Sequence, residues 1–152
     1  MNLTGKVALI TGARRIGGAV AAELARLGAD VGLSYNRSQA EAEQAADVVH
    51  ACGRRATVIH ADLSRSEDCR RLVDSTVAVL GRLDVLVNMA STYKVTPFDD
   101  LTVTDWQQVI AVDLTSAFLC AQASVPHLRQ AGGGRIINFS DWVAKSGRPR
   151  YK

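Results

Sequence analysis

The sequence predicts an α/β fold in which a doubly wound parallel sheet carries helices on both faces. Short apolar runs of strand length alternate with longer amphipathic segments along all 152 residues. The first run ends in a glycine-containing turn at 11–18 and continues as an alanine-rich segment, which is typical of a buried strand that feeds a helix. Hydrophobic residues make up 47% of the chain and charged residues 22%, so it can bury a core.

The individual elements follow from this alternation in chain order. Apolar runs bounded by turn residues predict the strands: 6–11, 30–35, 56–61, 84–88 and 134–139. Longer segments with helical periodicity predict the helices: 16–28, 39–52, 66–80 and 105–130. Because a helix follows each of the first four strands, successive strands are expected to run parallel.

Helix ends carry their own signals. In the first helix, Ile16, Val20, Leu24 and Leu27 are expected to form one buried face. Capping-box spacing predicts three helix starts: Ser38 with Glu41, Ser64 with Glu67, and Thr104 with Gln107. Glycines placed to accept a left-handed conformation predict the helix ends: Gly28, Gly53, Gly81 and Gly132–Gly134. Pro126 is expected to bend the long 105–130 helix, because it removes one backbone donor.

Composition excludes several classes of function. The net charge of +3 is spread along the chain, so nucleic acid is not an expected partner. Three scattered cysteines without metal-binding spacing predict reduced thiols, no metal site and a cytoplasmic protein. The N-terminus shows no cleavable hydrophobic segment, and no apolar run is expected to span a membrane.

The glycine-containing turn predicts a cradle for nucleotide phosphates. Glycine lets the backbone approach a pyrophosphate, and a helix N-terminus offers unpaired N–H groups and a positive dipole. The candidate residues lie in one loop: Gly12, Arg14, Arg15, Ile16 and Gly17. The alternative is a tight strand-to-helix turn with no ligand, because any such turn favours glycine.

The end of the second strand bears on which dinucleotide binds. No carboxylate follows Tyr35 to accept hydrogen bonds from a ribose 2′-hydroxyl, whereas Asn36, Arg37 and Ser38 offer donors to a 2′-phosphate. NADP(H) is therefore favoured over NAD(H). The alternative is that Ser38 only caps a helix and Arg37 is a solvated side chain.

These motifs together resemble the short-chain dehydrogenase/reductase family, and the resemblance runs over the whole chain. Thr11-Gly12 through Gly17 is similar to the family's TGxxxGxG cofactor loop, although one residue shorter. Asp62 and Leu63 resemble its adenine-contacting segment. Three further cofactor residues match its NNAG segment, in which Met89 replaces an asparagine: Asn88, Ala90 and Ser91.

Within the family, pteridine reductases and 3-oxoacyl-carrier-protein reductases are the most similar members. The pteridine-reductase likeness rests on four features: Arg15-Ile16-Gly17, Arg37-Ser38, Ala90-Ser91 and Asp141. It implies that Asp141, where most members carry serine, orients substrate or handles a proton, with Ser140 beside it. Asp113 lies where the family places a helix asparagine that holds a relay water, and a purely structural carboxylate is the alternative for it.

The family's catalytic Tyr-x-x-x-Lys pair is missing from residues 1–152. Tyr151 and Lys152 are adjacent and lack that spacing, so the pair is expected beyond Lys152. The resemblance thus implies one NADP(H)-binding Rossmann domain over 1–152 that is C-terminally incomplete after its fifth strand. Residues 1–152 alone are expected to turn over little substrate.

Three hypotheses for function follow. The first is an NADPH-dependent oxidoreductase that reduces a carbonyl, C=N or pterin-like small molecule by hydride transfer, with self-association through helix 105–130. The second is a non-catalytic NADP(H)-binding or regulatory module, and the third is an inactive fragment. Binding of NADP(H) by the chain would separate the second hypothesis from the third.

Overall fold

The computed structural model describes residues 1–92 and 96–141. Five parallel strands form one sheet in the order β3-β2-β1-β4-β5. The strands are β1 (Val7–Thr11), β2 (Asp30–Tyr35), β3 (Ala56–His60), β4 (Val85–Asn88) and β5 (Arg135–Asn138). The strand order reverses direction between β1 and β4, so loops leave the sheet to opposite sides at this point.

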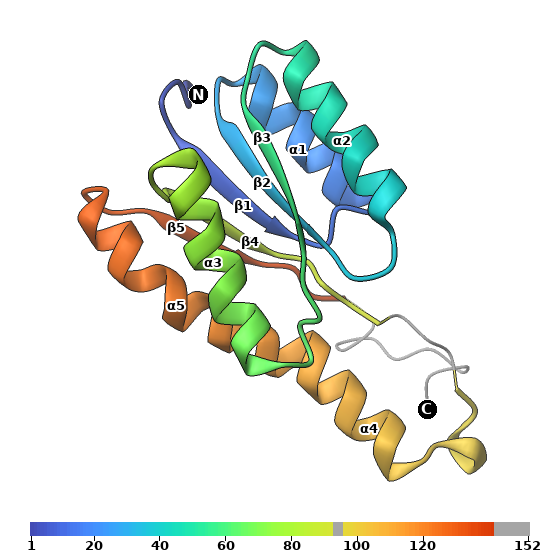
Figure 1. Cartoon of the computed structure of the whole chain (residues 1–152). Helices are drawn as coiled ribbons and strands as arrows, with labels where there is room; N and C mark the ends of the chain where they lie inside the picture. Colours follow the sequence, from blue (N-terminus) through green and yellow to red (C-terminus); the bar gives the residue numbers. More distant parts are fainter. Residues whose placement is uncertain (93–95, 142–152) are drawn as a thin grey trace.

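Helices cover both faces of the sheet (Figure 1). One face carries α1 (Ile16–Arg26) and α2 (Gln39–Ala51), and the other carries α3 (Ser66–Leu80) and α5 (Ser116–Gln130). The remaining helical turns are η1 (Phe98–Asp100), α4 (Val103–Val109) and η2 (Ile110–Thr115). The prediction of a parallel, doubly wound sheet is therefore confirmed.

The core consists of two apolar layers, one on each face. Successive residues of β1 supply both, because strand side chains alternate in direction. Ile10 packs with Val31 and Val87 beneath α1 and α2, whereas Leu9 packs with Leu86 beneath α3 and α5. The strands are apolar on both faces for this reason.

The predicted element boundaries agree with the structure to within two residues, but Ile16 does not join the buried face of α1. Its side chain is 62% exposed, and the buried positions of this helix are Gly17, Ala21 and Ala25. The helix approaches the sheet on small residues, because the glycine loop holds its first turn close to β1. The predicted face was therefore wrong at its first residue.

Two predicted capping boxes are absent. Ser38 is the N-cap of α2 but makes no side-chain cap hydrogen bond. Arg65, not Ser64, is the N-cap of α3, and the Ser64 hydroxyl instead donates to Asp62 Oδ1 at 2.7 Å. The Ser64 hydroxyl thus bonds to the Asp62 carboxylate and does not cap the N-terminus of α3, although the capping-box spacing predicts such a cap.

The predicted 105–130 helix begins earlier and is interrupted. Its N-cap is Thr102, which forms a capping box with Asp105, so the predicted start at Thr104 was wrong. The helical segment then runs from Val103 to Gln130 through the π-helical turn η2, which shifts the register between α4 and α5.

This segment is also the one helix among the described residues that is long and apolar enough to cross a membrane, judged by length and composition alone. The sequence-based expectation of no such run was therefore wrong. Part of the apolar character serves packing, because Cys120 and Leu128 of α5 lie in the core layer beneath α3.

Candidate functional site

The candidate site lies at the carboxyl ends of β1, β4 and β5, where the strand order reverses. In open α/β sheets this reversal leaves a crevice beyond the strand ends that binds ligands. The loops that follow β1 and β4 meet there, because Thr11 pairs in register with Asn88, and Asn88 with Asn138.

Two glycines set the backbone of the loop between β1 and α1. Gly12 has φ 88°, and a Cβ placed on it would lie 3.4 Å from the Cα of Ala90. A Cβ on Gly17 would collide with the carbonyl oxygen of Gly12. The Gly12 N–H donates to Ser34 Oγ at 3.0 Å, which holds the loop against β2. At these two glycines the loop thus offers backbone and no side chain to a ligand.

The first turn of α1 has no side-chain cap. Its N-cap, Arg15, adopts φ 55° and makes no side-chain cap hydrogen bond. A left-handed conformation is unfavourable for a residue with a Cβ, so the fold holds Arg15 there against a local cost. The uncapped N–H groups and the helix dipole suit an anion.

The other predicted residues of this loop lie at its rim. Arg14 Nε is 3.7 Å from Glu41 Oε1 of α2, and both side chains are largely solvated. The side chain of Ile16 is exposed. Arg14 therefore links the glycine loop to α2.

The ends of β2 and β3 form the next part of the site. Asp62 Oδ1 accepts from the Ser64 N–H at 3.1 Å and from Asn36 Nδ2 at a longer 3.5 Å, so the two strand ends are linked. Arg37 is exposed, and within residues 1–92 and 96–141 its side chain makes no hydrogen bond or ion pair. Among the described residues Arg37 therefore has no charged or hydrogen-bonding partner, whereas Leu63 is buried in the core.

The segment after β4 is pinned to the glycine loop. Thr11 Oγ1 accepts from the N–H groups of Met89 and Ala90 at 2.9 and 3.1 Å. Met89 therefore keeps its backbone role although it lacks the amide of the family motif. Asn88 is 5% exposed, and its Nδ2 donates to Asn138 Oδ1 at 2.9 Å. Its Oδ1 has no partner among the described residues, which leaves a buried acceptor at the strand ends.

Asp113, in the π-helical turn η2, accepts hydrogen bonds from the segment that follows β4. Its Oδ2 accepts from Ser91 Oγ at 2.8 Å, and its Oδ1 accepts from the Thr92 N–H at 2.9 Å. Both carboxylate oxygens are thus occupied by donors from the β4 loop. The structural alternative for Asp113 accounts for these contacts, and its role in a proton relay stays a prediction.

A pocket of about 420 Å³ opens beside this segment. The rings of Phe118 and Phe139 line this pocket. Its polar lining residues include Thr11, Asn88, Asp113, Asn138 and Ser140. Asp141 lies one residue beyond and is exposed. Ser140 and Asp113 thus share a pocket, whereas Tyr151 and Lys152 fall outside the described residues.

Sequence reasoning missed three residues of the site. Ser34 and Thr11 fix the glycine loop and the β4 loop, and Asn138 pairs with Asn88. All three are polar residues at the carboxyl end of a strand that is otherwise apolar, and this pattern could have identified them. Ser34 and Thr11 are buried, and a buried hydroxyl requires a hydrogen-bond partner.

Two buried carboxyl groups with lowered pKa values, Asp30 and Asp84, lie at the amino ends of the strands, away from the candidate site. Burial raises the pKa of Asp84, but hydrogen bonds from Arg82, the Val7 N–H and Lys6 outweigh it and hold the pKa below its usual range. Burial likewise opposes Arg55 and Arg54 at Asp30, whose pKa is also lowered. These groups serve stability rather than the site.

Comparison with known proteins places the chain among relatives. Residues 6–152 match the family model for short chain dehydrogenase. An uncharacterized oxidoreductase of Methylorubrum extorquens is 38% identical over 93% of this chain. A hydroxynaphthalene reductase of Aspergillus fumigatus is 35% identical over 99% of it. The chain spans 57% and 55% of the lengths of these two relatives.

Solved structures agree with this. A short chain dehydrogenase from Burkholderia cenocepacia in complex with NADP superposes with a TM-score of 0.90 at 34% identity, covering 97% of this chain and 60% of that one. An acetoin dehydrogenase from Salmonella typhimurium gives a TM-score of 0.88 at 37% identity, covering 97% and 59%.

Proposed function

This chain belongs to the short chain dehydrogenase family, and from that premise we propose that the protein is an NADPH-dependent oxidoreductase that reduces a carbonyl or C=N group. The observation that carries the proposal is the cradle formed by Gly12 and Gly17 against the uncapped N-terminus of α1. A side chain on Gly17 would collide with the Gly12 carbonyl, so the loop keeps its backbone close, and a helix N-terminus without a side-chain cap suits a pyrophosphate. Residues 1–152 therefore fit a dinucleotide.

The proposed cofactor contacts follow the strand ends. The glycine loop and the first turn of α1 would hold the pyrophosphate, and Asp62 with the N–H of Leu63 would face the adenine. Asn88, Ala90 and Ser91 would lie beside the nicotinamide end, where the buried Asn88 Oδ1 is available as an acceptor. When bound, the cofactor supplies the hydride for reduction.

Arg37 is the proposed determinant for NADPH. Arg37 is exposed at the end of β2 and makes no hydrogen bond or ion pair in the described part of the chain, so its guanidinium can form charge-assisted hydrogen bonds with a 2′-phosphate. Ser38 is half-buried beside Arg37. Its hydroxyl does not cap α2, so this group can also donate to the 2′-phosphate. The NADP complex of the Burkholderia relative supports the same choice.

Substrate is proposed to bind at the pocket that contains Ser140, with Asp141 at its edge. A carboxylate beside a hydroxyl can accept a hydrogen bond from a donor on the substrate, as a pterin-like ring requires, and orient it. The chain spans less than two thirds of its relatives, so the general acid is not assigned to a described residue. Self-association through 105–130 stays a prediction.

The test of the proposed function is coenzyme preference. We expect NADPH to bind more tightly than NADH, and Arg37→Asp to weaken NADPH binding by about tenfold or more while leaving NADH binding little changed. Isothermal titration calorimetry with both dinucleotides measures this. Arg129→Asp, which changes an exposed arginine at the far end of α5, is the matched control. Equal NADPH affinities in the parent and Arg37→Asp would remove the 2′-phosphate assignment.

A further inference from the structure

Two buried cysteines lie at the contact between α3 and α5, and neither is among the residues of the proposed site. Cys69 lies in the first turn of α3 and Cys120 in the second turn of α5. Both are completely buried, and Cys120 Sγ lies 4.0 Å from the carbonyl oxygen of Cys69. They belong to one core layer, so the thiols meet in an apolar environment at the seam between the two helices.

The two thiols differ in acidity. A hydrogen bond with the Cys120 thiol lowers the pKa of Cys69, in opposition to burial, which raises it. The same contact and burial raise the pKa of Cys120. The helix dipole adds to the difference, because Cys69 lies near the N-terminus of a long helix. The lowered pKa favours Cys69 over Cys120 as the thiol that loses its proton.

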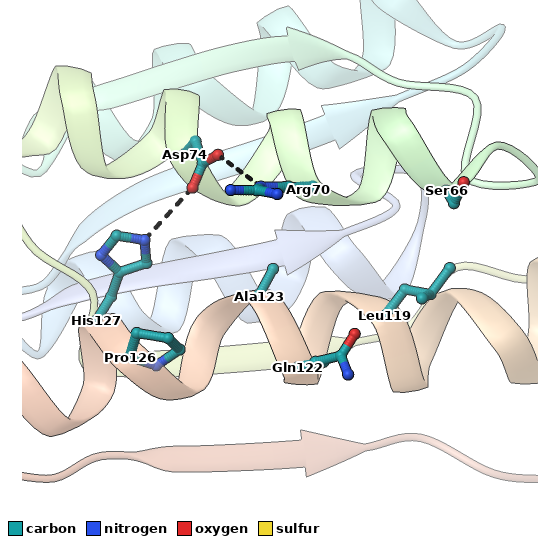
Figure 2. A pocket seen from close by; sticks show the side chains of 8 residues that line it. All are labelled: Ser66, Arg70, Asp74, Leu119, Gln122, Ala123, Pro126 and His127. Carbon is teal, nitrogen blue, oxygen red and sulfur yellow. Dashed lines mark hydrogen bonds and ion pairs between the residues drawn. The ribbon is translucent and has the colours of Figure 1, made fainter.

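A groove of about 500 Å³ runs between α3 and α5, outside the buried thiols (Figure 2). Ser66 and Arg70 of the groove flank Cys69 along α3, and Leu119 and Ala123 flank Cys120 along α5. A contact between Asp74 Oδ1 and His127 Nε2, at 3.4 Å, bridges the helices at one end of the groove. A small opening of this contact would admit a small oxidant to the seam.

We propose that Cys69 and Cys120 form a reversible disulfide that joins α3 to α5 when the protein meets a peroxide. The Cys69 thiolate attacks one peroxide oxygen, the O–O bond breaks, and a sulfenic acid and water result. Cys120 sulfur then attacks the Cys69 sulfur and releases a second water, which takes the Cys120 proton. Two thiols lose two electrons in total, and one hydrogen peroxide is reduced to two water molecules.

The bond would tie the two halves of the site together. The loop that carries Asp62 leads into α3, and the turn that carries Asp113 leads into α5. Oxidation would therefore restrict movement between the proposed adenine side and the proposed nicotinamide side. The inference itself does not depend on the proposed function, because it concerns two thiols outside the cofactor contacts.

The experiment treats the folded chain with hydrogen peroxide, quenches it, alkylates it in denaturant and maps the cysteines by mass spectrometry. The expected product has lost about 2 Da, carries one alkyl group at Cys52, and yields a linked peptide pair that contains Cys69 and Cys120. Reduction before alkylation should restore three alkylated cysteines. Cys52 is the internal control, because it lies at the end of α2 on the other face of the sheet.

Two results would overturn the proposal. One is alkylation of all three cysteines after peroxide treatment, and the other is sulfinic or sulfonic acid at Cys69 without a linked peptide. Cys52→Ser should keep the loss of about 2 Da, whereas Cys120→Ser should abolish it. Because the parent and Cys52→Ser keep both buried thiols, the test does not depend on the folding of Cys120→Ser.

Discussion

Gly17 lies against the carbonyl oxygen of Gly12, at the point where β1 passes into α1. A side chain there would collide with backbone on the other side of the loop, and the backbone cannot rotate away as a side-chain end could. Gly17→Ala should therefore lower the free energy of unfolding by about 2 kcal/mol through overpacking, and should open the cradle. Urea unfolding followed by circular dichroism measures the first effect.

Gly18 is the matched control for that change. A Cβ on Gly18 would meet Ala13 and Ala45 at ordinary contact distances of 3.4 and 3.6 Å. Gly18→Ala should leave stability unchanged or raise it by up to about 1 kcal/mol, because alanine favours the helix. If the two variants unfolded at the same urea concentration, the tight packing at Gly17 would be refuted.

Sequence reasoning at this scale found residue types better than contacts. The glycine loop could be predicted because only glycine permits such a close approach of backbone to backbone. The contacts of Asp113 with Ser91 and Thr92 could not, because they depend on the π-helical turn, which has no sequence signal of its own. The loss of the Ser64 cap to Asp62 has the same origin, since a tertiary neighbour outcompeted a local pattern.

Among the elements, α4 depends most on its N-terminal cap. The α4 helix is short and has no buried residue, so packing does little to fix its start. Thr102 Oγ1 accepts from the Asp105 N–H at 3.0 Å. Thr102→Ala should lower the free energy of unfolding by about 1 kcal/mol, whereas Thr104→Ala should change it little. Chemical unfolding of both variants measures the difference, and the reverse order would favour the cap that the sequence predicts.

The elements themselves could be predicted to within two residues because the strands are short apolar runs and the helices end at glycines. Gly28, Gly53 and Gly81 all adopt positive φ, as the sequence predicts for helix ends. The interruption of 103–130 could not be predicted, because no pattern in the sequence marks the π-helical turn at Ile110–Thr115.

At the scale of the whole molecule, buried carboxylates join the sheet at the amino ends of its strands. Asp84 is 4% exposed and accepts from Lys6 Nζ at 3.0 Å, Arg82 Nε at 2.8 Å and the Val7 N–H at 3.0 Å. It therefore links β1, β4 and the end of α3. The lowered pKa means that this stabilisation is fully present above about pH 4 and is lost as the pH falls through the folded value.

Asp84→Asn should lower the free energy of unfolding by about 2 kcal/mol at pH 7. The difference between parent and variant should shrink as the pH falls below about 4, because the parent then loses its charged acceptor. Urea unfolding at several pH values measures this. Asp47→Asn, at an exposed position on α2, is the control and should show no such convergence. A constant difference from pH 7 to about pH 3 would contradict the role of the ionised carboxylate.

The parallel sheet could be predicted from the alternation of strands and helices. In the observed strand order, the direction of winding reverses between β1 and β4, and open α/β sheets bind ligands beyond the strand ends at such a point. The pairing of Asn88 with Asn138 across the sheet could not, because it joins residues that are far apart in the sequence. The family match covers both ends of this arrangement, from residue 6 to residue 152.

The central claim is that the cradle of Gly12 and Gly17 binds the pyrophosphate of NADPH. A calorimetric titration of NADPH into the parent chain and into Gly17→Ala tests it most directly, with circular dichroism to show that both are folded. The account predicts saturable binding by the parent and a loss of about tenfold or more in affinity for the variant. No saturable binding by the folded parent chain, or equal affinity in a folded variant, would contradict it.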